Sequence, residues 1–240
     1  GIGQVTLKYA ELVNGEYCQY GASPSMNRYD IGFAFILPIP DQLKLLKEHY
    51  VKLCGKMIYM TVCETETVHE SYGTLLDFQP IYCPSEFARD ILKRQFPQGD
   101  WRLLRHWVPP VDIPPVPTRK TYTFYTIGNI VDPRKNIPML IDAFQTLKLA
   151  DCRLVLKATC KRIIELKIPG VVVINGLVSQ EQLESIHASG DCYVNCSFSE
   201  GVGMGAVEAA MRDKPCIIAE YGGLKEYVKT PYVKIGRAHV

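Results

Sequence analysis

Short apolar runs alternate with helical patterns along this chain, and the alternation is interrupted by one proline-rich segment. Runs such as Val171–Ile174 and Cys216–Ile218 are continuously apolar, which is typical of parallel strands covered on both faces. Between residues 109 and 117 the chain has five prolines in nine residues. Such a segment is stiff and extended, and it cannot join a central sheet. Strand–helix units on both sides of it therefore predict two α/β domains.

The predicted domains cover residues 1–108 and 120–233, with 109–119 as their linker. In the first domain the pattern predicts strands at 29–37, 57–63, 81–83 and 102–108, and helices at 5–13, 41–53 and 87–96. In the second it predicts strands at 122–127, 153–157, 171–175, 191–196 and 215–219, and helices at 137–147, 159–167, 180–188, 203–213 and 222–229. Ligands of open parallel sheets bind at the carboxyl ends of the strands, so we expect the functional residues in those loops.

The two ends of the sequence indicate a fragment. The chain begins at Gly1, and its last seven residues, 234–240, match the translation of the sequencing-adapter stretch AAG ATC GGA AGA GCA CAC GTC. We therefore expect native sequence to stop near Val233, which would leave the second domain incomplete. A native polar loop is the alternative interpretation of 234–240.

Composition excludes several classes of protein. Lys and Arg number 27 against 25 for Asp and Glu, so the net charge of +2 gives no reason to expect nucleic-acid binding. No apolar run reaches the 18 residues that a membrane helix needs. The nine cysteines include no Cys-x-x-Cys pair, which argues against a zinc ribbon or a thioredoxin-like site. We read them as structural thiols and expect a reducing compartment, the cytoplasm.

The most informative segment for chemistry runs from Ser197 to Met211. A strand ends here, a glycine-rich turn follows, and a helix begins whose free N–H groups can receive an anion. Glu200 precedes this helix and Glu208 lies inside it. Carboxylates repel phosphate but accept hydrogen bonds from sugar or ribose hydroxyls, so the pair favours a sugar-bearing ligand. The alternative is a dipole-stabilising Glu200 and a solvated Glu208.

The spacing Glu200-Gly-x-Gly-x-x-x-x-Glu208-Ala resembles the signature of family 4 glycosyltransferases, which have the GT-B fold. Further segments are similar to family elements in the family's order: 128–136 (GNIVDPRKN), 173–183 (VINGLVSQEQL) and 221–228 (YGGLKEYV), with looser likeness at 62–66 (VCETE) and 82–87 (YCPSEF). The resemblance covers most of residues 1–228. It implies two Rossmann-like domains that face each other, with the first strand of the N-terminal domain missing here.

The resemblance also implies a function. A member of this family transfers a hexose with retention from a nucleotide-sugar, here a UDP- or GDP-sugar, to an acceptor hydroxyl in polysaccharide or glycoconjugate biosynthesis. By analogy Glu208 binds the ribose hydroxyls, Glu200 binds the donor sugar, and Lys135 with Arg134 neutralises the leaving diphosphate. The remaining donor contacts are implied for three loops: Gly128 and Asn129; Gly176 and Leu177; and Gly201, Val202 and Gly203. No Asp-x-Asp motif is present, so we expect neither a metal ion nor a cofactor.

The first domain is implied to hold the acceptor, which is a glycan, a lipid-linked sugar or a protein. Gly1 and Gly3 resemble a second phosphate-side loop. The family often has a histidine where this chain has Glu64 and Glu66, so these carboxylates either contact the sugar or acceptor or are simply exposed. His106 is similarly either an acceptor-side residue or a packed histidine.

One further histidine and one loop residue bear on the alternative interpretations of the site and of the function. His187 follows Leu183 and Ile186 on a predicted helix, so we expect it to pack or to face solvent. Asn129 stands where many members carry an arginine, which shifts part of the diphosphate binding to Arg134. This departure keeps open a non-catalytic nucleotide-sugar-binding or scaffolding protein with the same fold. A nicotinamide enzyme is disfavoured, because the complete Gly-x-Gly-x-x-Gly is missing.

Overall fold

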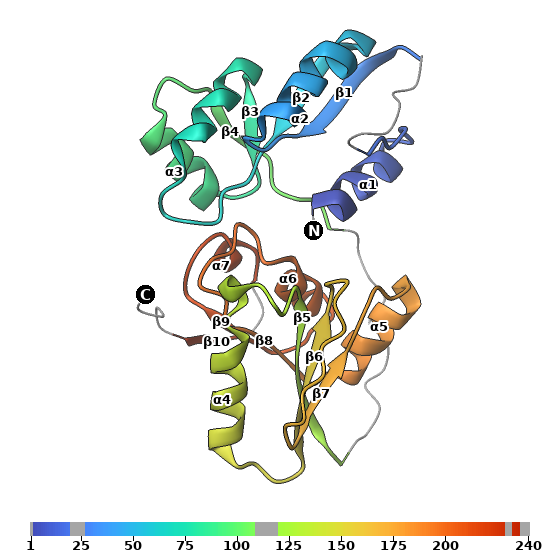
Figure 1. Cartoon of the computed structure of the whole chain (residues 1–240), viewed down its shortest axis with the longest axis vertical. Helices are drawn as coiled ribbons and strands as arrows, with labels where there is room; N and C mark the ends of the chain where they lie inside the picture. Colours follow the sequence, from blue (N-terminus) through green and yellow to red (C-terminus); the bar gives the residue numbers. More distant parts are fainter. Residues whose placement is uncertain (1, 20–26, 109–119, 229–231, 236–240) are drawn as a thin grey trace. The chain divides into compact units, whose positions relative to one another are not determined.

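The computed structural model describes residues 2–19, 27–108, 120–228 and 232–235. The chain divides into two compact units, Gly1–Trp107 and Val108–Val240, which are shown in Figure 1. The predicted linker at 109–119 lies outside the described residues.

The first unit is a four-stranded parallel sheet in the order β1-β2-β3-β4. Its strands are β1 (Tyr29–Phe35), β2 (Cys54–Met60), β3 (Ile81–Cys83) and β4 (Trp101–Leu103). Its helices are α1 (Ile2–Leu12), α2 (Pro40–Leu45), α3 (Glu86–Gln95) and the tighter or wider turns η1 (Leu46–Tyr50), η2 (Val51–Leu53) and η3 (Glu70–Phe78). Each predicted strand and helix of this half has a counterpart, but several bounds differ: the strand predicted at 102–108 ends at Leu103, and the helix predicted at 41–53 continues through η1 and η2. The turn η3 was not expected.

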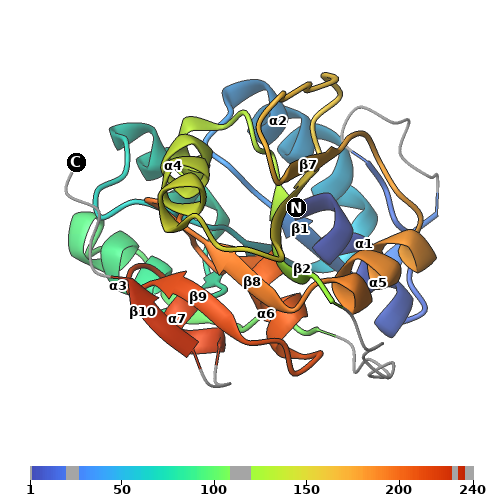
Figure 2. The ribbon, with the colours of Figure 1, turned by 90° about the horizontal axis from the view of Figure 1, so that it is seen from below.

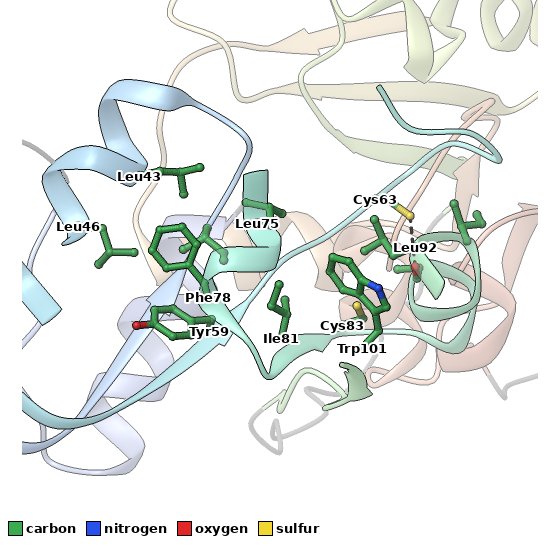
Figure 3. Close-up of a cluster of buried hydrophobic side chains, with 13 residues drawn as sticks. Leu43, Leu46, Tyr59, Cys63, Leu75, Phe78, Ile81, Cys83, Leu92 and Trp101 are labelled. Carbon is green, nitrogen blue, oxygen red and sulfur yellow. Dashed lines mark hydrogen bonds between the residues drawn. The ribbon is translucent and has the colours of Figure 1, made fainter. Parts of the chain in front are cut away.

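The core of this unit fills the space between the sheet and its helices (Figure 3). Helix α3 contributes Ala88, Ile91 and Leu92, whose spacing of three and four places them on one face. Ser85 begins that helix by accepting a hydrogen bond from the Ala88 N–H, the usual role of a serine at this position. Trp101 of β4 packs into the same cluster. The apolar spacing was therefore a sufficient guide to α3.

The second unit is a six-stranded parallel sheet in the order β10-β9-β8-β5-β6-β7. Its strands are β5 (Tyr122–Gly128), β6 (Cys152–Ala158), β7 (Val171–Ile174), β8 (Cys192–Asn195), β9 (Cys216–Ala219) and β10 (Tyr232–Ile235). Its helices are η4 (Pro133–Lys135), α4 (Ile137–Leu147), α5 (Gln180–Ser189), α6 (Met204–Ala210) and α7 (Leu224–Tyr227). Figure 2 shows β8, β9 and β10 side by side.

Helices cover both faces of this sheet. On one face Leu154 and Leu156 pack with α4, and on the other Tyr125 and Val155 pack with α5, α6 and α7. Figure 1 shows α4 and α5 on opposite sides of the strands. Both faces are buried, which explains why the strands are continuously apolar and not alternating.

The helix predicted at 159–167 is wrong. This segment runs as an irregular chain beside β7, and the Asn175 side chain accepts from the Ile164 N–H at 2.8 Å and donates to the Ile164 carbonyl at 3.0 Å. Ile164, Leu166 and Ile168 pack on the core at every second position, which is the period of an extended chain. An amide that uses both backbone groups of one residue competes directly with a helix there.

Strand β10 (Tyr232–Ile235) includes the first two residues of the segment 234–240, which was predicted to be adapter-derived. Its residues Lys234 and Ile235 pair in parallel with Ile218 and Ala219 of β9, and 236–240 lie outside the described residues. Strand pairing uses backbone groups, so an edge position accepts many sequences.

None of the nine cysteines, all of which the structure describes, forms a disulfide bond. Among the described residues, no helix combines the length and the apolar character that crossing a membrane requires.

Gly205 allows α6 to lie close to Tyr193 of the sheet. A methyl group at this position would stand 2.2 Å from the Tyr193 hydroxyl oxygen, which is itself buried and donates to the Ile127 carbonyl. Gly205→Ala should therefore lower the free energy of unfolding by about 1–3 kcal/mol, although alanine favours helices. Denaturant unfolding measures this. Gly128→Ala is the control, because its methyl would meet Lys135 Cε at an ordinary 3.8 Å. Equal stability of wild type and Gly205→Ala would contradict the packing.

Candidate functional site

The predicted site residues of the second unit lie on loops at the carboxyl edge of its sheet. Gly128 is the last residue of β5, and Glu200 lies between the end of β8 and the start of α6. Parallel strands end at one edge, so loops that are far apart in the sequence meet there. The same edge carries α6 and α7 in Figure 1.

Lys135 and Glu200 form the centre of the candidate site. Lys135 Nζ lies 2.5 Å from Glu200 Oε1, and the side chains are 23% and 9% exposed. The same carboxylate oxygen is 3.3 Å from Asn195 Nδ2. A carboxylate this buried needs such partners, because an unpaired buried charge is costly. The structure thus brings together two predicted residues that are 65 positions apart.

Three loops hold the backbone around this pair. The Phe198 N–H donates to the Arg134 carbonyl at 2.8 Å, and the Gly223 N–H donates to the Glu200 carbonyl at 3.0 Å. Gly222 has a φ of +76°, and a methyl group there would stand 2.3 Å from the Glu200 carbonyl oxygen. Glycine is required at this position for both reasons. Backbone contacts between the loops therefore hold Lys135 and Glu200 in position, in addition to the attraction between their charges.

Arg134 does not share the contact with Glu200. Its guanidinium binds Asp132 Oδ2 at 2.8 Å, and the other oxygen of Asp132 accepts from the Arg134 N–H at 3.0 Å. The Arg134 side chain is 40% exposed. The two adjacent cations predicted for the diphosphate thus differ: Lys135 points to Glu200, and Arg134 is held within its own turn.

The loop of Gly128 and Asn129 lies beside the lysine. A methyl group at Gly128 would touch only the Lys135 stem, at Cε. Asn129 is exposed, and its carbonyl accepts from the Asp132 N–H at 3.0 Å. This turn therefore brings the basic residues back over the end of β5.

Gly176 and Leu177 follow β7 at the same edge of the sheet. Gly176 has a φ of +79° and open space where a side chain would project, and Leu177 is 88% exposed. Lys157 is buried behind them and donates to the carbonyls of Ala158 and Gly176. Burial lowers the pKa of Lys157. The loop presents an open backbone and an apolar side chain, which are features that suit the flat face of a base.

The loop before α6 is buried and closely packed. Gly201, Val202 and Gly203 have little or no exposed surface, and Gly203 has a φ of +76°. A methyl group on Gly203 would stand 2.6 Å from Leu224 Cδ1 of α7. The three predicted residues thus connect Glu200 to the start of α6 with no room for larger side chains at the glycine.

Glu208 lies on α6 next to a buried polar cluster. Its Oε2 is 3.9 Å from His187 Nε2, and its backbone carbonyl accepts from Arg212. Arg212 also binds Glu184 of α5. His187 is fully buried, so the expectation that it packs is confirmed and solvent exposure is wrong. Burial lowers its pKa to about 4, with Arg212 as a further cause.

The predicted residues of the first unit lie on several of its segments. Gly1 is outside the described residues, and Gly3 lies within α1. Glu64 is partly buried after β2, whereas Glu66 is exposed and its carbonyl accepts from Arg94 at 2.6 Å.

His106 packs between aromatic rings in the first unit. Its ring centre is 6.4 Å from that of Tyr9 and 5.8 Å from that of Phe35. Burial lowers its pKa to about 4. These contacts match the expectation of a packed histidine, and its acceptor-side role stays a prediction.

Three residues that shape this site were not among the predicted site residues: Asn195, Gly222 and His187. The sequence predicted only that His187 packs or faces solvent, and Gly222 lies in the segment 221–228. Asn195 ends a buried strand, and Gly222 lies in a Gly-Gly pair, so each had a local signal. Across the parts of the chain that the structure describes, no three His, Cys, Asp or Glu side chains gather as a metal site. The absence of a metal from the reaction stays a prediction.

Several solved structures have a similar fold. The sucrose-phosphate synthase of Thermosynechococcus elongatus has a TM-score of 0.65 at 14% identity, over 99% of this chain and 66% of that one. TarM has a TM-score of 0.61 at 14% identity, over 87% and 45%. Anabaena HepE, solved with UDP and glucose, has a TM-score of 0.60 at 13% identity, over 86% and 64%. These likenesses confirm the predicted α/β fold of GT-B type. The chain spans between about half and two thirds of the length of these proteins.

A comparison with curated protein sequences gives no match. The family model described as "Glycosyl transferases group 1" matches residues 114–234, which is just over half of the chain. This range contains every candidate residue of the second unit. The chain belongs to the group 1 glycosyl transferases.

Proposed function

We propose that this chain carries the donor site of a retaining glycosyltransferase that moves a hexose from a UDP- or GDP-sugar to an acceptor hydroxyl without a metal ion. The observation that carries the proposal is the buried pair of Lys135 and Glu200 at the carboxyl edge of a parallel sheet. Membership of the family and the UDP and glucose named for HepE support a nucleotide-sugar as the ligand.

The pair suits a reaction in which a diphosphate leaves. Breaking the bond between the sugar and the diphosphate places negative charge on the leaving oxygen, and a fixed cation stabilises that charge. Without donor, Lys135 is balanced by Glu200. We propose that the diphosphate takes over Lys135 and that Glu200 then accepts hydrogen bonds from the sugar hydroxyls. The pair of Lys135 and Glu200 thus provides both the cation for the diphosphate and the acceptor for the sugar hydroxyls.

The other residues complete the donor site. Glu208 would bind the ribose hydroxyls, and the loop of Gly176 and Leu177 would contact the base. Arg134 would add positive charge at the rim, because it is tied to Asp132. The first unit, with Glu64, Glu66 and His106, would serve the acceptor, and we expect the reaction to take place in the cytoplasm.

The test is a donor panel with direct detection of both products. The chain is incubated with UDP- and GDP-hexoses, without and with EDTA, with water as the hydroxyl that receives the hexose. The released nucleoside diphosphate and the anomeric proton of the free hexose are followed by NMR before the hexose mutarotates. We expect release from one donor class, the same anomeric configuration in product and donor, and no effect of EDTA.

Each alternative has its own outcome in this panel. An inverted product would contradict the retaining mechanism, and loss of activity with EDTA would contradict the metal-free one. Donor binding without any release of nucleoside diphosphate would favour the non-catalytic protein.

A further inference from the structure

His187 is a buried side chain that the proposed reaction does not use. It lies near the end of α5, has no exposed surface, and its Nε2 has no hydrogen-bond partner among the described residues. A buried ring nitrogen without a hydrogen-bond partner is costly. The acidic oxygen nearest to this nitrogen is Oε2 of Glu208, at 3.9 Å. The nitrogen without a partner therefore lies beside Glu208, a predicted donor-binding residue.

The other ring nitrogen of His187 pairs with a tyrosine hydroxyl. Its Nδ1 lies 2.9 Å from the Tyr125 hydroxyl, which has no further hydrogen-bond partner among the described residues. Burial raises the pKa of Tyr125, so the hydroxyl keeps its proton. When this hydroxyl donates to Nδ1, the ring proton is on Nε2, on the side of Glu208. A lowered pKa keeps His187 neutral at pH 7.

Packing holds the imidazole in place relative to α6. The rings of His187 and Tyr125 meet edge to face at 5.6 Å, and a methyl group on Gly190 would stand 2.2 Å from the Tyr125 ring. Arg212 binds Glu184 of α5 and the Glu208 carbonyl of α6, which ties the two helices together. The Glu208 side chain is 21% exposed, whereas that of His187 has no exposed surface.

We infer that His187 is a positioning residue for Glu208: Nε2–H donates to the carboxylate when the ribose hydroxyls draw it into place, and this contact sets the preference for ribonucleotides. The distance of 3.9 Å is about 1 Å longer than an N–H···O hydrogen bond, so a small rotation of Glu208 closes it. A neutral donor orients the carboxylate without cancelling its charge, which stays available to the hydroxyls. The inference rests on the proposed donor site.

The experiment compares ribo- and 2′-deoxynucleotides on the same protein. Binding of UDP, 2′-deoxy-UDP, GDP and 2′-deoxy-GDP is measured by calorimetry for wild type, His187→Asn and His187→Gln. The amide of asparagine can replace Nδ1 but does not reach Glu208, whereas the amide of glutamine can replace the Nε2 donor. We expect His187→Asn to reduce the ribo/deoxy affinity ratio about tenfold and His187→Gln to retain most of it.

The outcomes separate the inference from the proposed function. A wild type that binds no nucleotide, or that binds ribo and deoxy forms equally, contradicts the donor site and the inference with it. A wild-type preference that Glu208→Gln abolishes but His187→Asn keeps overturns the inference alone. Equal weakening of both forms by His187→Asn also overturns it, since that is what a purely structural role gives.

A further variant covers the case in which His187→Asn does not fold. Tyr125→Phe keeps the ring in its packing position and removes only the hydroxyl that contacts Nδ1. We expect a reduced ribo/deoxy ratio, with unchanged far-ultraviolet circular dichroism. An unchanged ratio in this folded variant overturns the inference.

Discussion

Lys135→Ala is expected to lower the rate of sugar transfer about 100- to 1,000-fold, the loss that follows when one fixed group stabilising a developing negative charge is removed. The side chain is 23% exposed and pairs with Glu200, so bulk water screens its charge only in part. Rates at saturating donor measure this. Arg134→Ala is the neighbouring comparison and should lose less, because Arg134 is bound to Asp132.

A structural effect of the same substitution can be separated from the chemical one. Lys135→Ala leaves Glu200 buried without its cation, and that state is destabilising in its own right. The double variant Lys135→Ala/Glu200→Gln removes both charges and should recover stability, but not transfer. Recovery of transfer in the double variant, or a full rate in Lys135→Ala, would contradict the role of Lys135.

Glu200→Gln is expected to act on the sugar and not on the nucleotide. The variant keeps the shape of the side chain but loses the charge that accepts from the sugar hydroxyls, so kcat/KM for the nucleotide-sugar should fall about 10- to 150-fold. Binding of UDP or GDP without a sugar should be as tight as in wild type or tighter, because Lys135 no longer has a carboxylate partner. Steady-state kinetics and calorimetry give the two values.

Two results for Glu200→Gln would contradict its contact with the sugar. Loss of UDP and GDP binding together with sugar transfer would mean that Glu200 holds Lys135 in position and does not contact the sugar. An unchanged kcat/KM would remove Glu200 from the site altogether.

Local spacing was sufficient to predict most elements of the fold. Helix α4 has the predicted bounds because Ile137, Leu140 and Phe144 recur at helical spacing after a stretch of turn residues. The segment 159–167 has a similar content of Ile and Leu, yet it is extended. Its extended conformation is fixed by the hydrogen bonds between the Asn175 side chain and the backbone of Ile164, 11 positions away. The spacing of apolar residues carries no information about such a contact.

The site was predicted less completely than the fold. The resemblance selected Lys135 and Glu200 separately, but their contact depends on how the loops after β5 and β8 meet. Arg134 and Lys135 are adjacent and both basic. Only the geometry of the turn shows that Asp132 binds Arg134, whereas Lys135 binds Glu200. For His187 the sequence left packing and exposure open, because a single residue beside an apolar stripe fits either side of a helix.

The central claim, that the carboxyl edge of the second sheet binds a nucleotide-sugar, is tested most directly by calorimetric titration of UDP- and GDP-sugars. Wild type, Glu208→Ala and Lys135→Ala are compared, with the exposed carboxylate variant Glu165→Ala as control. We predict that one donor class binds, that Glu208→Ala and Lys135→Ala each weaken it about 10- to 150-fold, and that Glu165→Ala leaves it unchanged. Tight donor binding that neither Glu208→Ala nor Lys135→Ala weakens would contradict the site, and no binding of any donor would contradict the claim itself.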